Sequence, residues 1–201
     1  RPEELGIRPL RVVQLSDTHL GPWQSVSRLK RIVTNLLDHE PDLVLLTGDF
    51  LTMESNDTPG ALAEALSPLA ELPQRCFAIF GNHDHEAPEE VRSGLAANGI
   101  RLLVDDACTV GTEAGPVQLI GADYVRKDRD QHLESLLEEY PRLPEHRRIL
   151  LLHDPSAFHD LPKDDVDLVL SGHTHGGQVG LLSLGLNWTV LSRSRWPDHG
   201  H

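Results

Sequence analysis

Five short segments of the sequence carry carboxylate, amide and imidazole side chains directly after apolar runs. They are residues 16–19, 48–49, 81–84, 153–154 and 171–177. Carboxylate and imidazole groups suit borderline divalent ions such as Mn, Fe or Zn. No cysteine stands near these segments, which argues against a structural zinc site. The segments together therefore predict a centre that binds divalent metal.

The spacing within two of these segments adds to that prediction. Asp17 and His19 are two residues apart, and so are His173 and His175. In an extended chain such residues point to the same side, so each pair is expected to chelate. Taken singly, each segment is more typical of a turn or a helix cap, and His153 of a half-buried histidine. Five of them in order, each after an apolar run, favour the metal interpretation.

Apolar runs with β-branched residues predict the strands that position these segments. The runs cover residues 10–15, 43–46, 76–80, 149–152 and 166–170. Three further short strands, at residues 101–104, 107–110 and 117–120, suggest a second, more antiparallel sheet. In sheets of parallel strands, ligands bind beyond the carboxyl ends, which is where the five segments fall.

Helices are predicted between the strands. Leu29, Ile32, Val33, Leu36 and Leu37 form one face of an amphipathic helix that Pro41 ends. Further helices are expected at residues 61–72, with a kink or early break at Pro68, at 89–97 and at 131–140. This alternation indicates an α/β fold with right-handed crossovers.

Composition limits the classes of function. The 201 residues suit a single domain over residues 1–201, and the net charge of −13 argues against nucleic acid as the main partner. No apolar run approaches the ~20 residues of a membrane span, and no signal peptide is visible. We therefore expect a cytoplasmic protein, with peripheral membrane contact as an alternative. Cys76 and Cys108 are expected to be free thiols, although a single disulfide stays open.

The complete set of motifs resembles the calcineurin-like metallophosphoesterase superfamily. The matching positions are Asp17 and His19, Gly48 and Asp49, residues 81–84, His153 and residues 172–175. The form Gly-His-Thr-His-Gly-Gly-Gln is similar to a bacterial branch of phosphodiesterases and enzymes that cleave a lipid A precursor. The resemblance implies a four-layer α-β-β-α sandwich with two mixed β-sheets. Family chains continue with several more strands after this motif, so we expect a short form or one that lacks its C-terminal strands.

The resemblance also implies roles for the site residues. A first metal would be bound by Asp17, His19 and His175, and a second by Asn82, His153 and His173, with Asp49 bridging the two. His83 would stay unligated and face the substrate. Asp84 is a candidate to orient a catalytic ring, or to cap a turn. Asp154 is either a partner of a ligand imidazole or a helix cap.

These roles predict a dinuclear hydrolase of phosphoester bonds, with phosphodiester or pyrophosphate bonds as the expected targets. Two ions, with Mn favoured over Fe or Zn, would clamp the phosphate while a hydroxide that bridges them attacks in line. His83 would stabilise charge or protonate the leaving oxygen. The alternatives are a dinuclear hydrolase of another ester class and a non-catalytic binding module. No P-loop and no Gly-x-Ser-x-Gly motif supports a different enzyme class.

Substrate choice is expected to depend on loops. Trp23 stands beside the first pair of ligands, where it would stack on a substrate or be an exposed loop aromatic. Arg126, Lys127 and Arg129 would meet a second phosphate or be a solvated charge run. The apolar tail, residues 180–201, would accept an acyl chain or pack as a hairpin. The expected partner is a small-molecule or lipid-linked phosphoester.

Overall fold

The structure, a computed structural model, describes residues 8–52, 59–162 and 165–175. Its helices are α1 (Val26–Leu37), α2 (Ala61–Leu66), α3 (Pro88–Ala96) and α4 (Arg129–Glu139), with 3-10 turns η3 (Ser67–Glu71), η4 (Asp84–Glu86) and η5 (Pro155–Asp160). Its strands are β1 (Val12–Leu15), β2 (Leu43–Leu46), β3 (Cys76–Ala78), β4 (Arg101–Leu102), β5 (Asp106–Thr112), β6 (Gly115–Ala122), β7 (Arg147–Leu152) and β8 (Leu168–Leu170).

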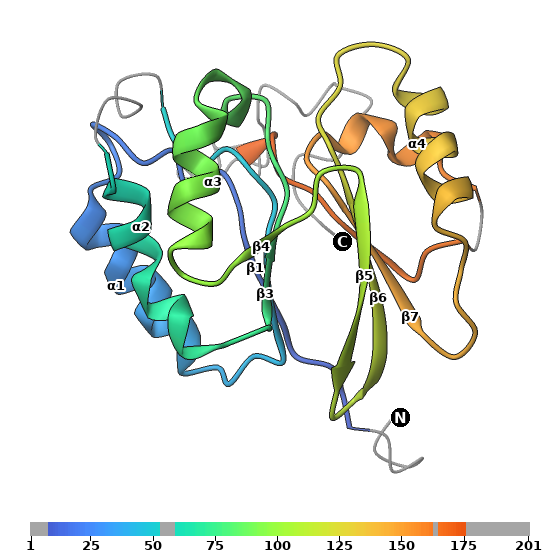
Figure 1. Cartoon of the computed structure of the whole chain (residues 1–201), viewed down its shortest axis with the longest axis horizontal. Helices are drawn as coiled ribbons and strands as arrows, with labels where there is room; N and C mark the ends of the chain where they lie inside the picture. The colour runs from blue at the N-terminus through green and yellow to red at the C-terminus, as the bar shows by residue number, and fades with distance from the viewer. Residues whose placement is uncertain (1–7, 53–58, 163–164, 176–201) are drawn as a thin grey trace, which may run out of the picture.

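The strands form two four-stranded sheets that lie face to face. The first has the order β1-β2-β3-β4 and the second β5-β6-β7-β8. Figure 1 shows α1, α2 and α3 over the outer face of the first sheet and α4 over that of the second. The predicted four-layer α-β-β-α sandwich is thus confirmed. Among the described strands, however, every pair of the first sheet is parallel, and only the second sheet is mixed.

One predicted strand belongs to the other sheet. Residues 101–104 were expected in the second sheet, but β4 pairs in parallel with β3, Phe77 opposite Arg101 and Ala78 opposite Leu102. Helix α3 makes the crossover that a parallel pair requires. Periodicity identifies a strand but does not identify its partner.

Alternation along the strands creates three apolar layers. In β2, Leu43 and Leu45 face the second sheet, whereas Val44 and Leu46 face the helices of the first. Strand β7 divides in the same way. Ile149 and Leu151 lie between the sheets, and Leu150 and Leu152 pack toward α4. Both sheets are therefore covered on both faces, as their continuous apolar runs predicted.

Local sequence signals explain where the helices begin and end. Ser25 caps α1 by accepting a hydrogen bond from the backbone of Arg28 at 3.3 Å. Leu29 and Val33 are buried as predicted, while Ile32 is 36% exposed at the margin of the apolar face. Pro68 breaks the next helix early, since α2 gives way there to the 3-10 turn η3.

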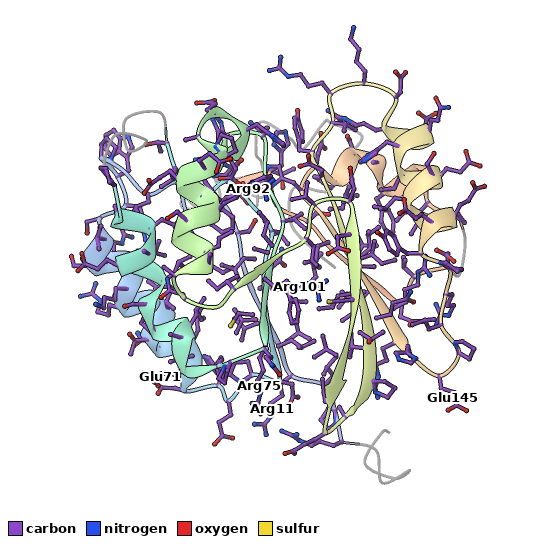
Figure 2. All side chains as sticks on the ribbon, in the orientation of Figure 1. Arg11, Glu71, Arg75, Arg92, Arg101 and Glu145 are labelled. Carbon is purple, nitrogen blue, oxygen red and sulfur yellow. The ribbon has the colours of Figure 1, made fainter. Side chains whose placement is uncertain are left out.

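The parallel strands of both sheets run in the same direction. Arg11, Arg75 and Glu145 precede β1, β3 and β7, and Figure 2 shows all three at one edge of the molecule. The carboxyl ends therefore meet at the opposite edge, which collects the five polar segments.

Three further expectations concern the chain as a whole. Cys76 and Cys108 are free thiols, the first buried and the second half-buried. Among the described residues, no helix has the length and apolarity needed to cross a membrane. Residues 176–201, including the apolar tail and any following strands, lie outside the described residues, so the single domain over residues 1–201 stays a prediction.

Candidate metal centre

Two clusters of possible metal donors lie at the carboxyl edge of the sheets. The first ligand group is Asp17, His19 and His175, and the second ligand group is Asp49, His153 and His173. Within each group one donor atom from every residue lies within 4.8 Å of the others. Each group combines residues from the end of a first-sheet strand with residues from a second-sheet strand. The sequence separations between members show that only the fold brings them together.

The first ligand group is tightly convergent. The Nε2 atoms of His19 and His175 are 3.1 Å apart, and the two rings stack with centroids 4.8 Å apart. The Nε2 atom of His175 also lies 3.6 Å from Oδ1 of Asp17. Lone pairs that face one another in this way form a favourable site for a shared cation.

The amide oxygen of Asn82 lies against the second ligand group. That oxygen lies 2.9 Å from Nδ1 of His173 and 3.2 Å from Nε2 of His153. The other ring nitrogen of His153, Nδ1, donates to the backbone carbonyl of Thr47 at 2.7 Å. In the neutral ring this bond fixes the tautomer, with the proton on Nδ1 and the lone pair of Nε2 facing the group. The sequence did not reveal this role of Thr47, since a backbone carbonyl has no residue signature.

Asp49 lies between the two groups. Its Oδ2 atom is 3.7 Å from Nε2 of His19 in the first group and 3.3 Å from Nε2 of His153 in the second. Its Oδ1 atom accepts a hydrogen bond from the backbone of His83 at 2.9 Å. The residue is only 2% exposed. One buried carboxylate thus faces both sets of imidazoles.

Burial and charge set the protonation of these groups. Burial lowers the pKa of His19 and of His173, which favours neutral rings with free lone pairs. Burial alone would raise the pKa of Asp49, but hydrogen bonding to His153 and the charge on that ring lower it. Burial likewise opposes charge on His153, yet Asp49 raises the pKa of that ring overall. Carboxylates, imidazoles and one amide oxygen form a donor set that fits borderline divalent metal ions.

Five site residues adopt a left-handed backbone that side-chain-bearing residues rarely use. The φ angles are 51° for Asp17, 40° for His19, 56° for Asp49, 69° for His173 and 51° for His175. Such conformations cost about 1–3 kcal/mol each and cluster at functional sites. They correct the expectation of extended segments at these positions. Asp17 and His19 nevertheless share one ligand group, as expected of that pair. His173 and His175 instead belong to different ligand groups.

Two glycines allow the loops of the centre to approach closely. A Cβ atom on Gly81 would lie 2.2 Å from Oδ1 of Asp49, inside any contact distance. Gly48, with φ of +91°, would place its Cβ 2.3 Å from the backbone nitrogen of Gly81. The loops after β2 and β3 therefore depend on glycine at both positions.

Asp84 does not orient a ring, although the sequence made it a candidate for that role. It is fully buried, and its carboxylate accepts backbone N–H groups of Asp49 at 2.7 Å, Phe50 at 2.8 Å and Gly81 at 2.7 Å. Burial raises its pKa to about 6, although these hydrogen bonds favour the charged form. Asp84 thus acts as a clamp between the two loops, in agreement with the turn-capping alternative.

His83 lies beside the first ligand group without joining it. Its ring centroid is 5.3 Å from that of His19, and its Nδ1 atom is 3.1 Å from Oε1 of Glu86. Because a carboxylate only accepts, Nδ1 carries the proton in this pair. Glu86 stands outside the sequence motifs. The three-residue spacing between His83 and Glu86 could have indicated this contact, because side chains three apart eclipse in a 3-10 turn such as η4.

Other candidates from the sequence are placed as follows. Asp154 caps η5 by accepting from the backbone of Ser156 at 2.8 Å and pairs with Arg129 at 2.5 Å, which supports the cap interpretation. The ion pair with Asp154 also shows that Arg129 is not part of a solvated charge run. Trp23 is 89% exposed.

Comparison with known proteins identifies the family. Residues 10–177 match the family described as calcineurin-like phosphoesterase. The chain is 33% identical to the uncharacterised metallophosphoesterase YkoQ of Bacillus subtilis (strain 168) over 86% of this chain, which spans 63% of that protein. It is 29% identical to the phosphodiesterase YaeI of Escherichia coli (strain K12), covering 94% of this chain and 68% of the relative. It is 27% identical to the UDP-2,3-diacylglucosamine pyrophosphatase LpxG of Chlamydia trachomatis, covering 86% of this chain and 65% of the relative.

A solved structure shows the same fold. The NAD nucleotidase NadN of Haemophilus influenzae superposes with a TM-score of 0.60 at 17% identity, covering 83% of this chain and 38% of that one. At this identity the likeness concerns the architecture alone.

Proposed function

Because the chain belongs to the calcineurin-like phosphoesterase family, we propose that it hydrolyses phosphoester bonds with two divalent metal ions. The observation that carries the two-metal part is the position of Asp49. One of its carboxylate oxygens lies 3.7 Å from an imidazole of the first ligand group and 3.3 Å from one of the second. A site for a single metal ion would not require a buried carboxylate that is shared by two groups of imidazoles.

The ligand roles follow the two groups. Asp17, His19 and His175 would bind one ion, and Asn82, His153 and His173 the other, with Asp49 bridging them. When bound, such a pair polarises phosphoryl oxygens and lowers the pKa of coordinated water. We propose Mn as the favoured ion, although Fe and Zn also accept this mixed set of oxygen and nitrogen donors.

His83 supplies the proton in this proposal. Its Nδ1 atom donates to Glu86, so in the protonated ring the proton that can be transferred stands on Nε2. The ring lies next to His19 and half-exposed, at the margin of the first ligand group. From there Nε2 can donate to the oxygen that leaves phosphorus.

We propose a phosphodiester or pyrophosphate bond as the target. Support comes from two relatives, one named a phosphodiesterase and one a pyrophosphatase of a lipid-linked nucleotide. The chain spans about two thirds of these proteins, so the complete reaction stays part of the proposal. A small-molecule or lipid-linked phosphoester is the expected partner.

The test is an assay after reconstitution with Mn, Fe or Zn. We expect bis(p-nitrophenyl) phosphate to be cleaved, p-nitrophenyl acetate to be spared, and the metal content to approach two ions per chain. Asp49→Ala should reduce kcat by at least about 10³-fold, since it removes the shared carboxylate. Asp38→Ala changes an exposed aspartate at the end of α1 and serves as the matched control. Full activity in Asp49→Ala would exclude the two-metal arrangement, and cleavage of the acetate alone would indicate another ester class.

A further inference from the structure

The loop after β6 forms part of the carboxyl edge, although the sequence motifs did not include it. Its backbone is fixed at three points. Asp123 donates its N–H to Oδ1 of Asp105 at 2.9 Å, and Tyr124 donates to Oδ1 of Asp123 at 2.8 Å. Arg129 donates through Nε to the carbonyl of Val125 at 3.0 Å. The loop is therefore preorganised rather than free to adapt.

The ring of Tyr124 lies against the second ligand group. Its centroid is 6.1 Å from the ring of His153, nearly perpendicular at 80°, and 6.3 Å from that of His173. The guanidinium of Arg129 lies over the same ring, 5.6 Å from its centroid. Arg129 is in turn bound to Asp154 at 2.5 Å. The aromatic ring is thus fixed in place while its side chain stays partly exposed.

Tyr124 and His83 adjoin different ligand groups. His83 contacts His19 of the first group, whereas Tyr124 contacts His153 and His173 of the second. A phosphodiester carries two organic groups, of which one leaves and one stays on phosphorus. If His83 serves the group that leaves, a fixed aromatic surface remains on the side of the second ligand group. Aromatic faces stack on planar rings in offset or edge-to-face arrangements.

We propose that Tyr124 is a specificity-determining residue that packs against a planar ring on the group retained by phosphorus. This inference rests on the proposed phosphoesterase function and adds a preference for diesters whose retained group is aromatic or a nucleobase. Arg129 acts as a positioning residue, because it contacts the Tyr124 ring and the Asp154 cap together.

The test uses three substrates that share one leaving group. Bis(p-nitrophenyl) phosphate retains an aromatic ring, methyl p-nitrophenyl phosphate retains a methyl group, and p-nitrophenyl phosphate retains none. For Tyr124→Ala we expect the ratio of kcat/KM on the first to that on the second to fall about 10-fold, mainly through KM. Tyr124→Phe keeps the ring and should stay within about 2-fold of the native ratio.

Trp23→Ala removes the exposed aromatic of the loop after β1, the other residue considered for stacking on the substrate, and should not change the ratio. A fall of the ratio in Trp23→Ala but not in Tyr124→Ala would assign the stacking to that loop and overturn the proposal. Metal content and the thermal midpoint are measured for every variant. Loss of metal from Tyr124→Ala, or an equal fall on all three substrates, would show that the ring only supports the ligands and would overturn the proposal. An unchanged ratio with active enzyme would also overturn it, whereas a native protein inactive on all three would reject the phosphoesterase function itself.

Discussion

The contact between His83 and Glu86 is a carboxylate–imidazole pair that lies beside the first ligand group without belonging to it. The carboxylate accepts a hydrogen bond from Nδ1 at 3.1 Å and holds the ring in its orientation. Both side chains are roughly 40% exposed, so the attraction is screened and its effect on stability is small. Its effect on catalysis depends on how much the leaving oxygen needs a proton.

We therefore predict a leaving-group dependence for Glu86→Gln. An alkoxide must be protonated as it leaves, so kcat on an alkyl diester should fall about 10-fold or more. p-Nitrophenolate is stable without a proton, so kcat on p-nitrophenyl substrates should change less than about 3-fold. Steady-state kinetics on the two substrate types measures this difference.

Glu89→Gln changes an exposed glutamate three residues further on and serves as the control for loss of charge. A double variant with His83→Ala should be no slower than His83→Ala alone, because Glu86 acts through that ring. Equal losses on both leaving groups would mean that Glu86 merely supports the 3-10 turn.

At the scale of residues, the sequence indicated the side chains whose chemical type suits metal binding. It did not indicate those whose role depends on their position in the fold. Asp17, His19, Asp49 and the other ligand candidates stand in motifs, and the structure brings them together. Glu86, Tyr124 and the carbonyl of Thr47 are ordinary in type. Their relation to the centre exists only after folding, so composition and spacing could not indicate it.

At the scale of elements, Asp84 joins the loop after β2 to the loop after β3. Its two oxygens accept three backbone N–H groups, from Asp49, Phe50 and Gly81. Asparagine offers one acceptor and would turn its amide N–H₂ toward at least one backbone donor. A buried donor left without a partner costs about 1–3 kcal/mol.

Asp84→Asn should therefore lower the free energy of unfolding by about 2–3 kcal/mol. Urea denaturation of the metal-free protein measures this, so that metal binding does not contribute. Asp38→Asn, at the exposed end of α1, should stay within about 0.5 kcal/mol of the native value. Native stability combined with lost activity in Asp84→Asn would restore the catalytic role first assigned to this residue.

The elements themselves could largely be predicted from periodicity and breakers. β2 was predicted at its observed bounds, and Pro68 ends α2 as expected. The pairing of the strands was harder to predict, because β4 joins the first sheet through a crossover that no local pattern specifies. The left-handed backbone at His173 and His175 was also invisible, since it depends on the packing of loops from both sheets.

At the scale of the molecule, each ligand group draws on both sheets. Asp17 and His19 follow β1, while His175 follows β8. Asp49 follows β2, while His153 follows β7. Bound metal would therefore tie the two sheets together at their carboxyl edge. The same sheets are also joined by an apolar layer that needs no metal, including Leu45, Leu119 and Leu151.

These two connections predict how the protein responds to metal removal. An ion present at 100 times its dissociation constant adds about 2.7 kcal/mol to the folded state. For the two proposed ions in a chain of this size, that corresponds to roughly 10–20 °C in Tm. Chelation by EDTA should lower Tm by this amount but leave a cooperative transition, because the apolar layer between the sheets persists.

Differential scanning calorimetry of native protein and of Asp49→Ala, each with and without Mn, separates the contributions. The native protein should show the full shift, and Asp49→Ala less than half of it, since one shared carboxylate serves both ions. Two results would contradict this account. An equal shift in both proteins would place the metal away from Asp49, and the loss of any cooperative transition in EDTA would mean that the apolar layer cannot hold the sheets without metal.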